Sequence, residues 1–137
     1  MKNITTKAFA VSLLMASTYG QTEDADKTLR LDNTPFKNSE IYCENDKELH
    51  PFQNEFELLD YYSMSSDEGE RQVIVTVENS SSGGRSLNHT HFVAILGNCE
   101  HINPMKFERK FNGKEIVTLT LNFGFSKFPI LKVINQP

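Results

Sequence analysis

Apolar and polar residues alternate along most of the second half of the chain, as in Val73, Val75 and Val77 with Ile74, Thr76 and Glu78 between them. A period of two places one set of side chains on one face of a β-strand. Five stretches are predicted to be strands: residues 71–78, 89–96, 105–111, 115–123 and 128–134. Five short strands in succession indicate an antiparallel sheet.

A different period marks residues 51–64. Phe52, Phe56 and Leu59 recur at helical spacing, Pro51 suits the first turn of a helix, and acidic residues cluster early. We therefore expect an α+β fold, with one helix packed on a twisted antiparallel sheet of about five to six strands. If this segment is instead a strand, the alternative is an all-β six-stranded sandwich.

Asn112-Gly113 is the strongest short-range turn signal in the chain and predicts a hairpin. A three-residue loop with a left-handed Gly113 would form one apolar face from both strands. That face consists of Met105, Phe107, Phe111, Val117, Leu119 and Leu121. Arg109 is the one charge within it and must reach the sheet edge, a carboxylate or a ligand.

The first twenty residues have the three regions of a secretory signal peptide. Lys2 and Lys7 precede an apolar run of about nine residues, which is too short to cross a bilayer, and small residues follow. Cleavage after Gly20 is expected, with a site near Ser17 as the alternative. We then expect a flexible acidic arm over residues 21–38 and a single domain over residues 39–137, which begins with a short strand at residues 39–43.

Two cysteines remain in the predicted mature chain, Cys43 and Cys99. Two cysteines in an exported protein allow only one intramolecular pairing, so we expect a Cys43–Cys99 disulfide. Free thiols and a metal pair are the alternatives, and neither cysteine has the neighbouring ligands that a zinc site needs.

The charge is unevenly distributed along the chain. The sequence has 14 basic and 18 acidic residues, and removal of residues 1–20 would leave 12 basic and 18 acidic. Residues 21–70 contain 14 acids and 4 bases, whereas residues 71–137 contain 4 acids and 8 bases. The mature protein is therefore expected to be dipolar, with a mildly basic strand-rich half.

Four bases lie close to the predicted hairpin, and we call them the basic rim: Lys106, Arg109, Lys110 and Lys114. Such a rim would meet an anionic partner, either an acidic protein surface or an RNA backbone. The alternative is a solvated edge whose lysines discourage aggregation between strands.

The candidates for catalysis or metal binding are few. His89 and His91 would share one face of a strand, but no third metal ligand follows at a recognisable spacing. His101, Glu108 and Arg109 could serve a metal-independent ribonuclease, except that adjacent strand residues point to opposite faces. We therefore predict no catalytic residue, metal or cofactor, with an active secreted ribonuclease as the runner-up.

Two sequons for N-glycosylation, at Asn79 and Asn88, flank the Ser/Gly-rich loop between the first two predicted strands. In an exported protein this pattern predicts an exposed and glycosylated loop.

The order of elements resembles that of the ribonuclease-like secreted effectors of powdery mildew fungi. The similarity covers residues 39–137: Ile41-Tyr42-Cys43 places an aromatic residue before the first cysteine, and a helix, antiparallel strands and a single second cysteine follow. This resemblance implies a fold like that of fungal guanyl-specific ribonucleases without their catalytic residues. If residues 52–64 form a strand, the chain instead resembles the small six-stranded sandwich effectors of fungal plant pathogens.

The first resemblance implies a non-catalytic virulence factor, and both imply a secreted effector. It would be secreted, translocated into host cells, and would bind a host protein or host RNA to suppress defence. We expect it to be monomeric and to have no membrane association once the signal peptide is cleaved. An extracellular binding protein unrelated to infection is the third hypothesis.

Overall fold

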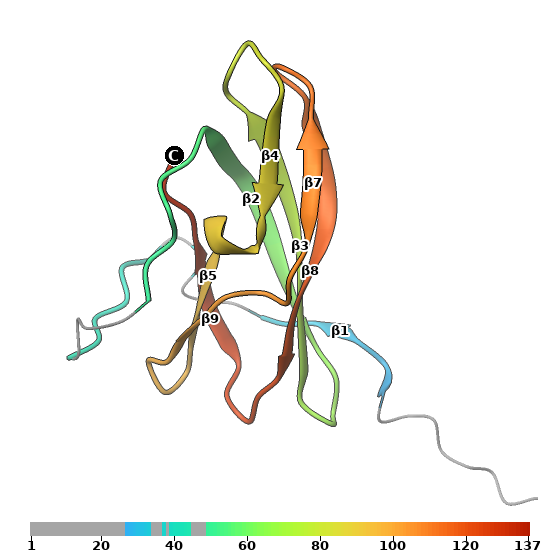
Figure 1. Ribbon diagram of the computed structural model, residues 1–137. Helices are drawn as coiled ribbons and strands as arrows, with labels where there is room; N and C mark the ends of the chain where they lie inside the picture. Colours follow the sequence, from blue (N-terminus) through green and yellow to red (C-terminus); the bar gives the residue numbers. More distant parts are fainter. Residues whose placement is uncertain (1–26, 34–36, 38, 45–48) are drawn as a thin grey trace, which may run out of the picture.

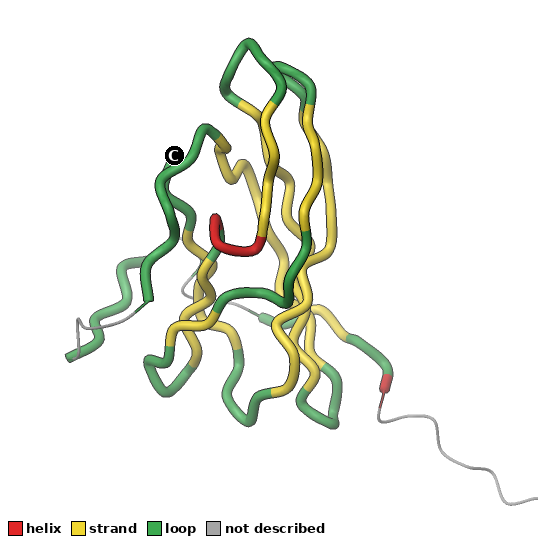
Figure 2. Tube along the Cα trace, in the orientation of Figure 1, coloured by secondary structure: helices red, strands yellow, loops and turns green. Residues whose placement is uncertain are grey.

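The computed structural model describes residues 27–33, 37, 39–44 and 49–137, so the predicted signal peptide lies outside the described residues. The fold is almost entirely β-structure (Figure 2). The strands are β1 (Arg30–Leu31), β2 (Phe56–Ser65), β3 (Glu70–Asn79), β4 (Arg85–Asn88), β5 (Val93–Leu96), β6 (His101–Ile102), β7 (Glu108–Phe111), β8 (Ile116–Phe125) and β9 (Ile130–Ile134). One 3₁₀ turn, His89–His91, connects β4 to β5.

The strands form two layers (Figure 1). One layer is a four-stranded antiparallel sheet in the order β1-β2-β3-β8. The other consists of the two-stranded β4-β7 ribbon and the three-stranded sheet β6-β5-β9. Apolar side chains from both layers fill the space between them, which makes the molecule a β-sandwich with a single core.

The core explains why the alternating segments form strands. Every second residue of β3 is buried, including Val73, Val75 and Val77, whereas all four residues of β5 are buried because that strand is covered on both faces. The members of the core cluster are Phe56, Tyr61, Val73, Val75, Val77, Leu87, Phe92, Ala94, Leu96, Phe111, Leu121, Phe123, Ile130 and Val133. Full burial of each valine contributes roughly 1.5–3 kcal/mol through the hydrophobic effect.

The predicted helix at residues 51–64 is wrong, and with it the α+β fold class. Most of the segment is β2, which pairs with β3 along its length, so the all-β alternative fits better. The pairing shifts by one residue between Leu58 and Asp60, which is a β-bulge. Phe56 and Tyr61 therefore both face the core although they are five positions apart, and this broken period of two imitates helical spacing.

The connection from β3 to β4 and the connection from β7 to β8 lie against each other, and we call this place the double corner. Asn79 is fully buried at this point, and its Nδ2 donates to the carbonyl oxygens of Gly83 at 2.9 Å and Asn112 at 2.8 Å. Gly113 packs so closely that a Cβ there would lie 2.0 Å from the carbonyl oxygen of Ser82. Asn79 and Gly113 thus hold the two corners against each other.

The predicted register of the hairpin at Asn112-Gly113 is also wrong. β7 pairs with β4 and β8 pairs with β3, so the apolar face expected from β7 and β8 does not form. Lys114, not Gly113, has the left-handed backbone conformation, with φ of 60°. The turn itself is present, because Glu115 N donates to Asn112 O at 3.3 Å, but the two strands it joins enter different layers.

Other predicted strands are found with changed limits. The stretch at residues 89–96 contains only β5, because residues 89–91 form the 3₁₀ turn. Residues 39–43 contain no strand, and β1 lies within the segment that we expected to be a flexible arm. β1 and β6 have two residues each, too few for a period of two to be recognised.

The Cys43–Cys99 disulfide is confirmed. The two Cα atoms lie 5.8 Å apart, and the bond joins segment 39–44 to the turn between β5 and β6. Segment 39–44 contacts the second layer again where Lys132 Nζ donates to the carbonyl oxygen of Ser39 at 2.9 Å. The disulfide therefore anchors to the sandwich a segment that has no strand of its own.

Candidate partner-binding site

The β4-β7 ribbon carries most of the predicted site residues. Leu87 lies opposite Arg109, and Ser86 lies opposite Lys110. Leu87 and Phe111 are buried and anchor the ribbon to the core, while Ser86 and Lys110 are directed to the other face. The ribbon thus has one apolar face that packs on the large sheet and one polar face that meets solvent.

The four residues of the basic rim are all exposed, but the structure does not bring them into one cluster. Lys110 is on the polar face, whereas the Arg109 guanidinium lies 5.8 Å from the ring of Phe111. Lys114 lies at the corner, where its Nζ donates to the carbonyl oxygen of Ser80. Lys106 precedes β7 and lines the cavity at the other end of the ribbon. The four bases of the rim are therefore distributed along the ribbon.

A cavity of about 400 Å³ lies at the corner end of the ribbon. It is lined by Gly84, Arg85, Ser86, Lys110, Phe111 and Asn112. Sequence reasoning missed Arg85, because only the pairing of β4 with β7 places it opposite Phe111 and brings it to the same cavity as Lys110. The Arg85 guanidinium pairs with Glu55, and this hydrogen bond raises the pKa of Arg85 and lowers the pKa of the Glu55 carboxyl.

A second cavity, of about 440 Å³, lies at the other end of the ribbon. It is lined by Asn88, His89, Thr90, Lys106, Phe107 and Glu108. The Glu108 carboxylate accepts a hydrogen bond of 2.6 Å from the Ser86 hydroxyl, which holds it on the polar face. The ribbon therefore has a cavity at each end, and each contains a lysine, an aromatic ring and hydrogen-bonding groups.

His89 and His91 do not share the face of a strand, as we had expected, because they belong to the 3₁₀ turn. The Nδ1 atom of His91 accepts from the backbone N–H of Asn88 at 3.3 Å. Burial, and to a smaller extent the charge of His89, lowers the pKa of His91 and favours its neutral form. His91 is therefore a capping residue of the turn, while His89 lines the cavity.

Each of the two ribbon cavities has an exposed lysine in its lining. Lys106 and Lys110 form no ion pair within the part of the chain that the structure describes, so their charges are open to an external partner. Phe107, which is half-buried, supplies apolar surface beside Lys106. Cations next to aromatic rings are a common composition of protein interfaces.

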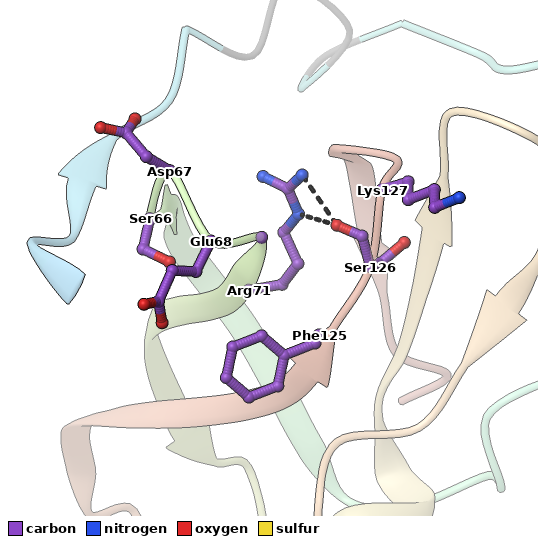
Figure 3. A pocket seen from close by; sticks show the side chains of 8 residues that line it. Ser66, Asp67, Glu68, Arg71, Phe125, Ser126 and Lys127 are labelled. Carbon is purple, nitrogen blue, oxygen red and sulfur yellow. Dashed lines mark hydrogen bonds between the residues drawn. The ribbon is translucent and has the colours of Figure 1, made fainter. Parts of the chain in front are cut away.

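A third cavity, of about 450 Å³, lies at the opposite end of the sandwich (Figure 3). Arg71 is only 9% exposed there, and its Nε and Nη2 donate to the carbonyl oxygen of Ser126 at 3.2 and 3.0 Å. Its Nη1 donates to the Ser65 hydroxyl, which in turn donates to Asp32 at 2.7 Å. Arg71 thus fastens the β2–β3 turn to the β8–β9 loop.

The other charged groups of this third cavity do not converge on Arg71. In Figure 3 the carboxylates of Asp67 and Glu68 and the ammonium group of Lys127 point away from the guanidinium. Asp67 instead lies 3.6 Å from the guanidinium of Arg30. We therefore assign Arg71 a structural role and do not place the partner site here.

No three His, Cys, Asp or Glu side chains gather in a metal-binding group within residues 27–33, 37, 39–44 and 49–137. His101 lies near His50, with ring centroids 6.2 Å apart, and its Nδ1 is 3.0 Å from the carbonyl oxygen of Leu49. Among the described residues, no helix is long and apolar enough to span a membrane.

The two sequons have different surroundings. Both Nδ2 hydrogens of Asn79 are used by the corner carbonyls, and its side chain is fully buried, so the folded state has no room for a glycan there. Asn88 is half-buried, and it is its Oδ1 that accepts hydrogen bonds from the N–H and hydroxyl of Thr90. Glycosylation stays a prediction, and Asn88 is the sequon that this fold can present.

No family model, curated protein or solved structure matches this chain.

Proposed function

We propose that the protein is a secreted, non-catalytic effector of a fungal plant pathogen that binds a host protein with an acidic surface. The observation that carries the binding role is the polar face of the β4-β7 ribbon, with a lysine-containing cavity at each end. Lys110 and Arg85 stand at one end and Lys106 at the other. Complementary charge would speed the encounter and select the partner.

Secretion and a role in infection rest on other features. A disulfide between the only two cysteines of the predicted mature chain supports an oxidising compartment, as does the predicted signal peptide. The all-β fold removes the helix on which the resemblance to ribonuclease-like effectors depended. The host-directed role therefore rests on the resemblance to small sandwich effectors of fungal plant pathogens.

A binding experiment with charge reversal tests the proposal. The oxidised mature protein, immobilised, is exposed to plant extract, and retained proteins are identified at several salt concentrations. Lys106→Glu and Lys110→Glu should each reduce retention of the partner about tenfold at low salt, and retention by the wild type should fall as salt rises. Lys127→Glu reverses an exposed charge at the far end of the sandwich and should leave retention unchanged.

The outcomes separate the partner classes. Equal retention by Lys110→Glu, Lys106→Glu and the wild type would contradict the ribbon as the binding surface. Retention that disappears after treatment of the extract with ribonuclease would identify RNA as the partner in place of a protein.

An active ribonuclease remains the second candidate because of one observation. His89, Lys106 and Glu108 line the same cavity, and a histidine, a carboxylate and a cation are the groups that metal-independent phosphate transfer uses. Incubation of RNA with the protein in EDTA tests it. Cleavage that is lost in both His89→Ala and Glu108→Gln would replace the non-catalytic proposal, and we expect no cleavage.

A further inference from the structure

The outer edge of β8 has backbone groups directed away from the sheet. Asn79 N donates to Glu115 O at 2.9 Å, and the register continues from this pair to Val77↔Val117 and Val75↔Leu119. In an antiparallel ladder only every second pair exchanges hydrogen bonds. The odd-numbered residues of β8 therefore bond to β3, and the N–H and C=O groups of the even-numbered residues point outward.

A second observation confirms this direction. Met105 N donates to Asn122 O at 2.7 Å from outside the sheet. Between the start of β8 and Asn122, the outward N–H and C=O groups of Thr118 and Thr120 have no strand beside them among the described residues, because β7 pairs with β4 in the other layer. Both threonines are exposed, so this part of the edge is open to solvent.

Between Ile116 and Leu121 the open edge also lacks the features that keep sheet edges apart, since the register shift of β8 lies beyond Asn122. The sequence of β8, IVTLTLNFGF, contains no charge and no proline over ten residues. Natural edge strands are usually protected by lysine, proline, a bulge or a covering segment. An uncharged edge with free hydrogen-bonding groups favours the addition of another strand.

The sequence of this edge is nearly the same in both directions around Leu119. If a second β8 lies antiparallel with its Leu119 opposite the first Leu119, Thr118 faces Thr120 of the second copy and Val117 faces Leu121 of the second copy. The Thr118–Thr120 pairs are then the hydrogen-bonded ones, since their groups point outward. The ladder ends at Asn122, whose carbonyl oxygen is already bonded to Met105.

We propose that two copies of the chain associate through their β8 edges about a two-fold axis at Leu119. The two four-stranded sheets then form one continuous sheet, and the interface is self-complementary, as a symmetric dimer requires. No like charges meet in β8, and the threonine pairs contribute cross-strand hydrogen bonds. This inference is independent of the partner-binding proposal and departs from the monomer that the sequence led us to expect.

Analytical ultracentrifugation of the oxidised mature protein, from micromolar to millimolar concentration, tests the dimer. Thr118→Pro removes an outward N–H together with the hydroxyl that bonds to Thr76 at 2.9 Å, and Thr120→Lys introduces like charges near the axis. Each should raise the dimer dissociation constant at least tenfold. Gln72→Lys is the control: Gln72 pairs with Asn122 from β3, one strand inside the edge and where the proposed ladder ends, so its dissociation constant should stay within about twofold of the wild type.

The register can be tested separately by cross-linking. In the proposed dimer the two Leu119 Cα atoms would lie about 4.5 Å apart, close enough for a disulfide. Leu119→Cys should give a covalent dimer on mild oxidation, and Val117→Cys, which faces Leu121 of the second copy, should not. A wild type that stays monomeric up to millimolar concentration, or folded Thr118→Pro and Thr120→Lys variants that dimerise like the wild type, would overturn the proposal.

Discussion

The two edges of the four-stranded sheet are protected very differently. The β2 edge is covered by β1, where Asp32 N donates to Ser63 O at 2.8 Å. Further along the same edge, Asp60 Oδ1 accepts the N–H of Tyr61 at 2.9 Å and is paired with Lys37. Within the part of the chain that the structure describes, the β8 edge receives one backbone bond from outside, at Asn122, and β8 itself carries no charge.

This difference shows that edge protection depends on tertiary contacts and not only on the strand itself. β1 and Lys37 both precede Cys43 in the chain, and the disulfide attaches that part of the chain to the β5–β6 turn. The β2 edge is therefore covered by a segment that a covalent bond helps to hold. The β8 edge has no such segment among the described residues, which leaves it available to a partner strand.

Proline substitution at neighbouring positions of β8 should have the largest effect and tests the direction of its backbone groups. Leu119→Pro removes an N–H that bonds to β3 and should destabilise the protein by about 3 kcal/mol or more, while Thr118→Pro removes an outward N–H and should cost much less. Urea unfolding of the two variants measures the difference. Equal losses of unfolding free energy in the two variants would contradict the assignment of the Leu119 N–H to β3 and of the Thr118 N–H to the open edge.

Loss of the disulfide should remove the protection of the β2 edge. Cys43→Ala, combined with Cys99→Ala to avoid a free thiol, should lower the free energy of unfolding by roughly 2–5 kcal/mol. Thermal unfolding measures this loss. Amide hydrogen exchange should also become faster relative to β8 at Asp32, whose N–H donates to the Ser63 carbonyl oxygen, and at Tyr61. Unchanged exchange would show that β1 covers β2 without help from the disulfide.

Removal of the Asp60 carboxylate, which accepts the Tyr61 N–H and pairs with Lys37 at the edge of β2, should have a smaller effect. Asp60→Ala leaves the Tyr61 N–H without its acceptor and Lys37 without its partner, and should cost about 1 kcal/mol. Asp60→Asn keeps an acceptor oxygen and should cost less than half as much. Chemical denaturation of both variants checks the order, which would be contradicted if Asn were as destabilising as Ala.

Acid should weaken the interactions of the Asp60 carboxylate with Lys37 and with the Tyr61 N–H. The hydrogen bond from Lys37 lowers the pKa of the Asp60 carboxyl, with smaller contributions from Tyr62 and the Tyr61 N–H. A folded-state pKa below the unfolded value of about 3.9 means that this stabilisation is present above pH 4 and is lost as the pH falls through the lowered folded-state pKa. The melting temperature of Asp60→Asn should therefore decline less than that of the wild type below pH 4, and parallel curves would exclude this linkage.

The sequence alone identified the longer alternating strands, above all β3, because alternation is a local property of a half-buried strand. β3, β8 and β9 were predicted close to their limits. The Cys43–Cys99 pairing also followed from the cysteine count alone. The basic residues of the ribbon were predicted to be near one another, but their division between two cavities was not.

Only the tertiary structure decided the features that depend on contacts between distant segments. The bulge between Leu58 and Asp60 made β2 look helical, since a local pattern cannot show where a strand is interrupted by its partner's register. The pairing of β4 with β7 placed Arg85 opposite Phe111, in the cavity that Lys110 also lines, and separated β7 from β8, although Asn112-Gly113 favours a simple hairpin. Burial of Asn79 and the close approach of Gly113 to Ser82 at the double corner outweighed that local preference, and the same choice left the edge of β8 open.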